Sequence, residues 1–196
     1  MWACCAECGT LEVMRIVVCV KHVPDMQSER RFEGGRLVRG EDDVLNELDE
    51  NAIEAAVQLK ESEEDAGREA EVVALTMGPE DAEDSLMRAL QMGADRAYIV
   101  SDEFLEGSDV ITTASVLSVA IAKIAQECGP VDLVLTGMAS LDAMTSMLPA
   151  ALAAKAHMPL LGLARSLNVE DGVLTIERAV DGYTETVRAA LPAVVS

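Results

Sequence analysis

The chain has 196 residues, of which 35 are Asp or Glu and only 15 are Lys or Arg, so its formal net charge is −20. A charge of this sign and size excludes nucleic acids and anionic membranes as partners bound through a basic surface. Half of the residues are hydrophobic but only 3% are aromatic, so we expect a core of aliphatic side chains and Met. No apolar run approaches the roughly 20 uninterrupted residues of a membrane span. The odd count of five cysteines and the lack of a signal-peptide pattern predict a cytoplasmic protein that is not inserted in a membrane.

The first thirteen residues differ from the rest of the chain. They contain Cys4, Cys5 and Cys8, the last two in C-x-x-C spacing. A structural zinc site needs about four ligands, and a thioredoxin-like pair follows a strand, so we expect neither a metal nor a redox site here. We predict a disordered extension at 1–13, or an upstream start codon with Met14 as the first residue of the fold. No linker interrupts residues 14–196, which we expect to form one domain.

Strands and helices alternate along the body of the chain. Short β-branched or aliphatic runs predict strands at 15–20, 72–75, 97–100 and 131–136. Apolar residues at helical spacing predict helices at 46–60, with Asn46 as the cap, at 79–93, at 110–128 and at 143–157. The alternation predicts an α/β fold, with a parallel sheet covered by helices on both faces.

Two regions interrupt this alternation. Gly34 and Gly35, followed by alternating polar and apolar residues, predict a small edge hairpin before the first helix. From about residue 163, alternating apolar residues on both sides of the turn at Asp181 and Gly182 predict a C-terminal antiparallel hairpin.

The carboxyl ends of the predicted parallel strands are the place to expect a ligand, because clefts form there where the strand order reverses. These ends are residues 19–21, 77–79 and 137–142, each near a helix start. Backbone N–H groups and the helix dipole at such starts favour a phosphate. The P-loop and G-x-G-x-x-G patterns are absent, so we expect an adenine nucleotide to bind without ATP hydrolysis.

Several polar residues near these strand ends have two possible roles. Lys21 and His22 could contact a phosphate, or could pair with the acidic helix that follows. Asp142 could bind ribose hydroxyls or cap the next helix. His157, beside a Met-Pro pair at a helix end, is interpreted as a capping residue. No nucleophile and base pattern is present, so we expect a protein that is not an enzyme by itself.

Six separated segments together resemble electron transfer flavoprotein beta subunits, especially the bacterial ones. The C-terminal segment fits the family signature at Arg178, Asp181, Gly182, Glu185 and Pro192, whereas Tyr183 stands where a glycine or an acid is usual. The other segments, in chain order, are residues 20–25, 46–52, 78–79, 89–96 and 134–137. The resemblance covers residues 14–196.

The resemblance implies a Rossmann-like, adenine-nucleotide-binding fold and a heterodimer. In this family the alpha subunit carries most of the FAD site, and the beta subunit buries a structural AMP. Electrons pass from acyl-CoA dehydrogenases of fatty acid oxidation, or from other dehydrogenases, through the FAD to a respiratory acceptor. The AMP positions carried over from the family are Cys19, Asn46, Glu47, Leu48, Asp49, Met77, Gly137, Met138, Ala139, Ser140, Leu141, Asp142, Ala143, Met144, Thr145, Ser146, Met147 and Leu148.

The chain departs from the family pattern in two places. Bacterial relatives usually have glycines after the Asp of the last nucleotide loop, whereas Ala143, Met144, Thr145 and Ser146 follow Asp142 here. Family members also continue beyond the final strand with a loop that recognises dehydrogenases and an arm that grips alpha, whereas this sequence stops at Ser196. On this basis we expect either a fragment or a chain without that docking function.

Two other functions compete with a beta subunit. A stand-alone adenine-nucleotide-binding module, acting as a sensor or regulator, would bind AMP or ATP without a flavin partner. An adenylating enzyme would need a loop rich in Ser and Gly after the first strand, and residues 20–23 do not supply one.

Overall fold

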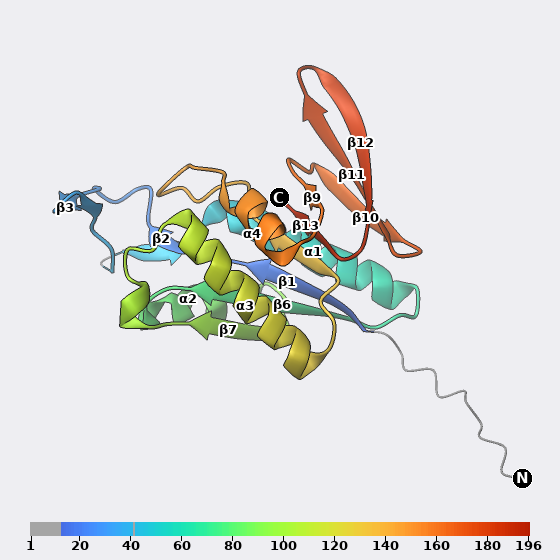
Figure 1. The fold of residues 1–196 in the computed structure, drawn as a ribbon, viewed down its shortest axis with the longest axis horizontal. Helices are drawn as coiled ribbons and strands as arrows, with labels where there is room; N and C mark the ends of the chain where they lie inside the picture. Colours follow the sequence, from blue (N-terminus) through green and yellow to red (C-terminus); the bar gives the residue numbers. More distant parts are fainter. Residues whose placement is uncertain (1–12, 41) are drawn as a thin grey trace, which may run out of the picture.

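The computed structural model describes residues 13–40 and 42–196, so the prediction for 1–12 lies outside the described residues. The main sheet has six strands in the order β7-β6-β1-β8-β13-β9, and every neighbouring pair is parallel (Figure 1). Its strands are β1 (Met14–Cys19), β6 (Ala70–Met77), β7 (Arg96–Val100), β8 (Leu133–Thr136), β9 (Leu160–Leu161) and β13 (Ala193–Val195). The predicted α/β fold is confirmed.

Helices cover both faces of this sheet. The 3-10 turn η1 (Glu80–Ala82) leads into α2 (Glu83–Gln91), which lies with α1 (Glu47–Asp65) on one face, and α3 (Val110–Cys128) and α4 (Leu148–Ala156) lie on the other. Successive residues of β6 show the division, since Val72 packs with α1 and α2 whereas Val73 packs with α3 and α4. The central strands are therefore buried on both sides, as the continuous apolar runs predict.

The helix α3 is the one described helix long and apolar enough to cross a membrane by length and composition. Its buried side chains recur at helical spacing and belong to the hydrophobic cluster on the sheet. These side chains are Ala114, Leu117, Ile121 and Ile124. One apolar stripe of this helix therefore packs against the sheet, whereas other apolar side chains such as Ile111 and Val119 are exposed.

Two predicted helices have different limits in the structure. The first continues to Asp65. The helix predicted at 143–157 is wrong over its first part, because residues 143–147 form a loop and α4 begins at Leu148. Met144 and Ser146 have φ values of 52° and 51°, a left-handed conformation that a right-handed helix cannot contain. His157 ends α4, as predicted, and its N–H bonds the carbonyl of Ala153.

Three smaller sheets are antiparallel. The strands β2 (His22–Pro24) and β5 (Asp43–Leu45) form one pair, and β3 (Phe32–Glu33) and β4 (Arg36–Leu37) form the predicted edge hairpin. The C-terminal sheet contains β10 (Ser166–Glu170), β11 (Val173–Val180) and β12 (Tyr183–Ala190), and the β11–β12 hairpin projects from the body (Figure 1). The predicted C-terminal hairpin is confirmed, and β13 then returns the chain to the parallel sheet.

Two buried threonines near the carboxyl ends of β6 and β8 provide a test of this packing. Thr76 Oγ1 has no hydrogen-bond partner among the described residues, whereas Thr136 Oγ1 lies 3.4 Å from the carbonyl oxygen of Val195. We predict that Thr76→Val raises the free energy of unfolding by about 1 kcal/mol, because it removes an unsatisfied buried hydroxyl. The matched change Thr136→Val should lower it. Urea denaturation measures both, and a less stable Thr76→Val variant would contradict the prediction.

Candidate functional site

The order of the strands reverses between β1 and β8. From β1 the chain moves to β6 and β7 on one side, and it then places β8 on the other side of β1. Ligands of open α/β sheets bind beyond the carboxyl ends of the strands at such a point. Three predicted segments meet there: Lys21 after β1, the first turn of α1, and residues 137–142 after β8.

Asp49, in the first turn of α1, joins the ends of the two central strands. Its carboxylate accepts a hydrogen bond from the N–H of Lys21 at 2.8 Å and from the N–H of Gly137 at 3.1 Å. Position 137 has no room for a side chain, since a Cβ there would lie 2.9 Å from the carbonyl carbon and oxygen of Leu48 and would also meet the carboxylate of Asp49. Glycine therefore allows the loop to pass directly over the helix start.

Asn46 determines the path of the next part of the loop. It occupies the N-cap position of α1, as predicted, although its side chain makes no capping hydrogen bond. Instead, Nδ2 donates to the carbonyl of Ala139 at 3.0 Å and Oδ1 accepts from the N–H of Leu141 at 3.0 Å. Asn46 is fully buried, so these two bonds satisfy an amide that has no access to water.

Asp142 ends this loop in a buried ion pair. Its carboxylate is 1% exposed, accepts from Lys21 Nζ at 2.9 and 3.0 Å, and also accepts from Arg39. Burial alone would raise the pKa of Asp142, but the bonds from Lys21 and Arg39 hold it below its ordinary value. Asp142 does not cap α4, which begins at Leu148, and Lys21 pairs with Asp142 rather than with the acidic helix. The ribose contact stays a prediction.

Three cationic side chains gather on residues 140–142. Lys21 Nζ reaches Ser140 Oγ at 3.3 Å, Arg39 pairs with Asp142, and Arg30 donates to the carbonyl of Leu141 at 3.2 Å. Sequence reasoning missed both arginines, which lie in the edge region between β2 and β5. In a chain with 35 acidic and 15 basic residues, such a grouping creates a local positive potential suited to an anion.

Two ionisable groups lie at the switch point, the place between β1 and β8 where the strand order reverses, and both have strongly shifted pKa values. Burial raises the pKa of Asp49 to about 7, although hydrogen bonds from Asn46, Lys21 and Gly137 act in the opposite direction. Burial and the nearby charge of Asp49 raise the pKa of Cys19 to about 12. The thiol is therefore protonated at neutral pH and is no nucleophile.

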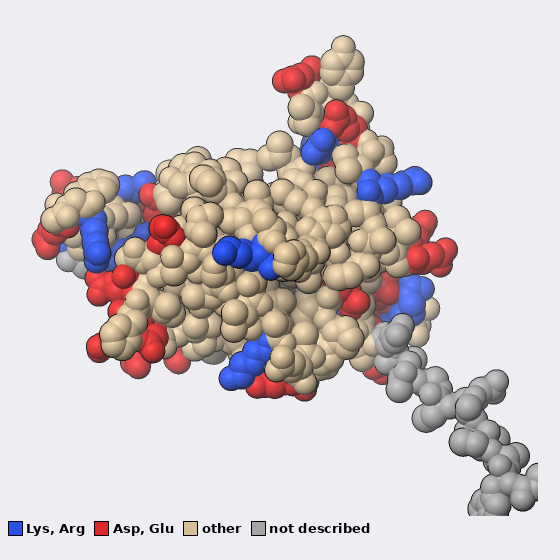
Figure 2. Space-filling view, viewed as in Figure 1, with Lys and Arg blue, Asp and Glu red and all other residues tan. Residues whose placement is uncertain are grey.

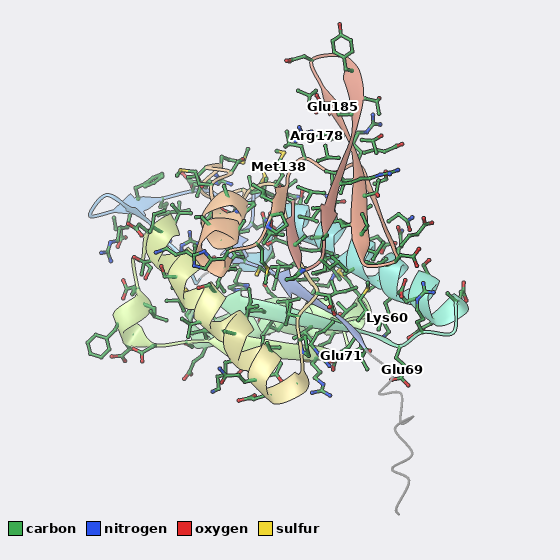
Figure 3. All side chains as sticks on the ribbon, turned by 45° about the vertical axis from the view of Figure 1, so that its right-hand side comes forward. Lys60, Glu69, Glu71, Met138, Arg178 and Glu185 are labelled. Carbon is green, nitrogen blue, oxygen red and sulfur yellow. The ribbon has the colours of Figure 1, made fainter. Side chains whose placement is uncertain are left out.

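The remaining predicted site residues divide into buried and exposed groups. Cys19 belongs to, and Met77 packs against, the hydrophobic cluster on the α3 and α4 face of the sheet. Met138, Met144 and Met147 have half-exposed side chains, and Figure 3 places Met138 at the opposite end of the sheet from Glu69 and Glu71. His22, predicted as a phosphate contact or an ion-pair partner, has its Nδ1 2.7 Å from Ser85 Oγ in a buried pair with α2.

Comparisons with known proteins point to one family. The family described as electron transfer flavoprotein domain matches residues 35–196. The chain is 40% identical over 184 residues to the electron transfer flavoprotein subunit beta of Mycobacterium leprae, covering 92% of this chain and 68% of the relative. It is 34% identical over 188 residues to protein FixA of Sinorhizobium fredii, covering 93% and 64%. It is 35% identical over 181 residues to the caffeyl-CoA reductase-Etf complex subunit CarD of Acetobacterium woodii, covering 91% and 66%.

The raised pKa of Asp49 predicts how stability depends on pH. A carboxyl whose pKa rises on folding from 3.8 to about 7 stabilises the folded state fully below about pH 4, and this contribution is lost as the pH rises through 7. The lowered pKa of Asp142 acts with the opposite sign, but only at acid pH below its ordinary value. We therefore expect the free energy of unfolding to fall between about pH 5 and pH 8.

The variant Asp49→Asn isolates this effect, because an amide does not titrate. We expect it to be less stable than the parent chain by about 1 to 3 kcal/mol at about pH 5, since an NH₂ group would face one of the two N–H donors. Its stability should also change less between pH 5 and pH 8. Urea denaturation at several pH values gives the free energy of unfolding of both chains as a function of pH. The same pH dependence in the two chains would refute the assignment of the raised pKa to Asp49.

The close approach at Gly137 gives a second prediction for the site. Gly137→Ala should lower the free energy of unfolding by about 1 to 3 kcal/mol, because the new methyl group would push the loop away from α1. Gly162→Ala is the matched control, since a Cβ there would lie 3.5 Å from Ser196 Oγ, an ordinary contact. It should change stability by less than about 0.5 kcal/mol. Equal effects of the two changes in urea denaturation would show that residue 137 is not crowded.

Proposed function

Because the chain belongs to the electron transfer flavoprotein family and is of its beta type, we propose that it pairs with an alpha subunit and holds an AMP at the switch point between β1 and β8. The observation that carries this proposal is the loop at 137–142, which is shaped by Asn46 and Asp49 and surrounded by three cations. We propose that residues 14–196 act as one domain in this role.

The backbone of the loop after Asp142 supports the proposed binding of the AMP phosphate. Met144 and Ser146 adopt left-handed backbone conformations, which glycines would adopt without strain. Left-handed non-glycine residues cost about 1 to 3 kcal/mol each and concentrate at functional sites. The hydroxyls of Thr145 and Ser146 could donate to a phosphate that Lys21, Arg30 or Arg39 also attracts. The loss of the usual glycines is therefore compatible with phosphate binding.

The nucleoside end would lie near the carboxyl ends of β1 and β6. Cys19, buried at the end of β1, and Met77, half-buried at the end of β6, are uncharged there, which suits contact with an adenine ring. The protonated state of the Cys19 thiol, which follows from its raised pKa, keeps this contact neutral. The base of the nucleotide would then contact uncharged side chains, and its phosphate would lie beside the three cationic side chains.

The beta chain would act as a scaffold and carrier subunit rather than as a catalyst. The alpha subunit would hold most of the FAD, and electrons would pass from dehydrogenases through that flavin to a respiratory acceptor. The beta chain itself would lie in the cytoplasm. Acyl-CoA dehydrogenases of fatty acid oxidation are the proposed donors. The name of the Acetobacterium woodii relative, which places it in a caffeyl-CoA reductase complex, supports an oxidoreductase of CoA esters as partner. The flavin itself would supply the redox chemistry.

A largely uncharged face supplies the proposed contact with alpha. Figure 2 shows few charged side chains over α3 and α4, although the whole chain is strongly acidic. Exposed apolar side chains follow the nucleotide loop and the edge strand β9 nearby. They are Met138, Met144, Met147, Leu160 and Leu163. Burial of such side chains against a partner is the usual basis of a stable subunit interface.

Co-expression with an alpha-type subunit of the same organism tests this function. We expect a complex that releases FAD and AMP in nearly equal amounts when heated. A colourless chain that carries AMP alone would instead support the stand-alone nucleotide-binding module. A chain with neither nucleotide nor partner would refute both functions.

Asp142→Ala refines the test within this complex. We expect AMP content to fall severalfold while the flavin potential stays nearly unchanged, because the flavin would lie mainly in alpha. Arg178→Ala is the control, since it removes an exposed 2.8 Å ion pair with Glu185 on the projecting hairpin (Figure 3). A shifted flavin potential with full AMP content would contradict the assignment of Asp142 to the nucleotide site.

A further inference from the structure

Both phenylalanines of the chain are exposed. The side chain of Phe104 is 97% exposed and that of Phe32 is 70% exposed. Burial of a Phe side chain is worth about 1.5 to 3 kcal/mol, so the fold gains almost none of this stabilisation from either residue. A protein with so few aromatic residues that leaves both phenylalanines in water has a surface suited to a partner.

Phe104 is held outward by an ordered turn. It lies in the 3-10 turn η2 (Glu103–Leu105), and the carboxylate of Asp102 accepts its N–H at 2.9 Å. Ser108 Oγ donates to the carbonyl of Leu105 at 2.7 Å, and the side chain of Leu105 is half-buried. Because local hydrogen bonds fix the turn, little conformational entropy remains to be lost when the ring docks.

Three segments that are far apart in sequence meet around this turn. The segments after β6 and β7 leave neighbouring parallel strands, and the N–H of Gly78 donates to the carbonyl of Val100 at 3.1 Å. Arg36, on the hairpin that carries Phe32, pairs with Glu106 at 3.2 Å. We call the surface formed by residues 32–37, 78–87 and 101–109 the acidic end.

The acidic end is mainly acidic, with nine Asp or Glu and one basic residue, Arg36. Eight of the nine lie in residues 78–87 and 101–109, which contain no Lys or Arg. Figure 2 shows many acidic side chains, with a few basic ones, at the left-hand end of the molecule. The eight are Glu80, Asp81, Glu83, Asp84, Asp102, Glu103, Glu106 and Asp109. Carboxylates around an exposed aromatic ring repel anionic surfaces, and a second copy of this chain, with a charge of −20, is itself repelled.

We propose that the acidic end is a docking site for a redox partner protein, a donor or an acceptor, whose contact surface carries Lys and Arg around an apolar socket for Phe104. The proposal rests on the proposed function, because it assumes that electrons enter or leave a flavin in the complex. Within the acidic end, residues 78–87 and 101–109 lie around the β7 edge of the sheet, whereas the nucleotide loop follows β8 and the apolar face lies beside β9. Alpha and the partner could therefore bind together.

Site-specific photo-crosslinking identifies the occupant. The complex with alpha is produced in cells with p-benzoylphenylalanine in place of Phe104, and in a control with the same analogue in place of Tyr183. Tyr183 is 75% exposed at the tip of the β11–β12 hairpin, so it matches Phe104 in kind and exposure. Mass spectrometry identifies the crosslinked proteins. The same crosslinking is repeated with the chain expressed without alpha, so that a failure of this proposal can be distinguished from a failure of the chain to bind alpha.

The linked protein is then purified and titrated against the complex at low and high salt. We expect position 104 to link an oxidoreductase other than alpha, and Phe104→Ala to weaken its binding at least about tenfold. Tyr183→Ala should have little effect, and salt should weaken binding because the charges are exposed. The proposal is overturned by linkage to alpha alone, by the same products from both positions, by no product, or by an unchanged affinity of Phe104→Ala.

Discussion

The hydrogen bonds that the Asp49 carboxylate accepts from Lys21 and Gly137 are the contacts on which the site depends. They join the ends of β1 and β8 where the strand order reverses, and so connect the two halves of the sheet through the first turn of α1. The same contact requires glycine at 137, because the carboxylate and the backbone of Leu48 occupy the space that a side chain would need. Burial raises the pKa of this carboxyl to about 7, so the bonds that shape the site come from a group whose charged form is disfavoured by its surroundings.

Apolar and cationic side chains both lie near the loop that Asp49 and Asn46 shape. Cys19 belongs to, and Met77 packs against, the hydrophobic cluster on the α3 and α4 face of the sheet, whereas Lys21, Arg30 and Arg39 contact residues 140–142 of the loop. Asp142 pairs with two of these cations and so holds them beside the loop. The combination explains how a chain with a net charge of −20 could hold an anionic ligand.

The sequence predicted the alternating elements well, because each strand and helix has its own hydrophobic period. It also indicated the ends of β1 and β8, which Asp49 joins where the strand order reverses; among the described residues, no hydrogen bond or ion pair brings the third predicted strand end, residues 77–79, onto the same loop. It did not predict the loop at 143–147, since the apolar residues there fit a helix and only the backbone reveals the left-handed conformations at Met144 and Ser146. The sequence placed Asn46 at the N-cap but did not predict its side-chain partners, because a cap is a local interaction whereas Ala139 and Leu141 lie far along the chain. The same limit applies to Arg30 and Arg39, which fold onto the loop from a region with little regular structure.

Amide hydrogen exchange at single-residue resolution, with and without AMP, tests most directly whether the first turn of α1 shapes a nucleotide loop. The account predicts that the N–H groups of Gly137 and Leu141 are protected in the chain without nucleotide, because Asp49 and Asn46 accept their hydrogen bonds. It also predicts that AMP adds protection mainly at residues 142–147. Rapid exchange at Gly137 and Leu141, or a response to AMP elsewhere in the sheet, would contradict it.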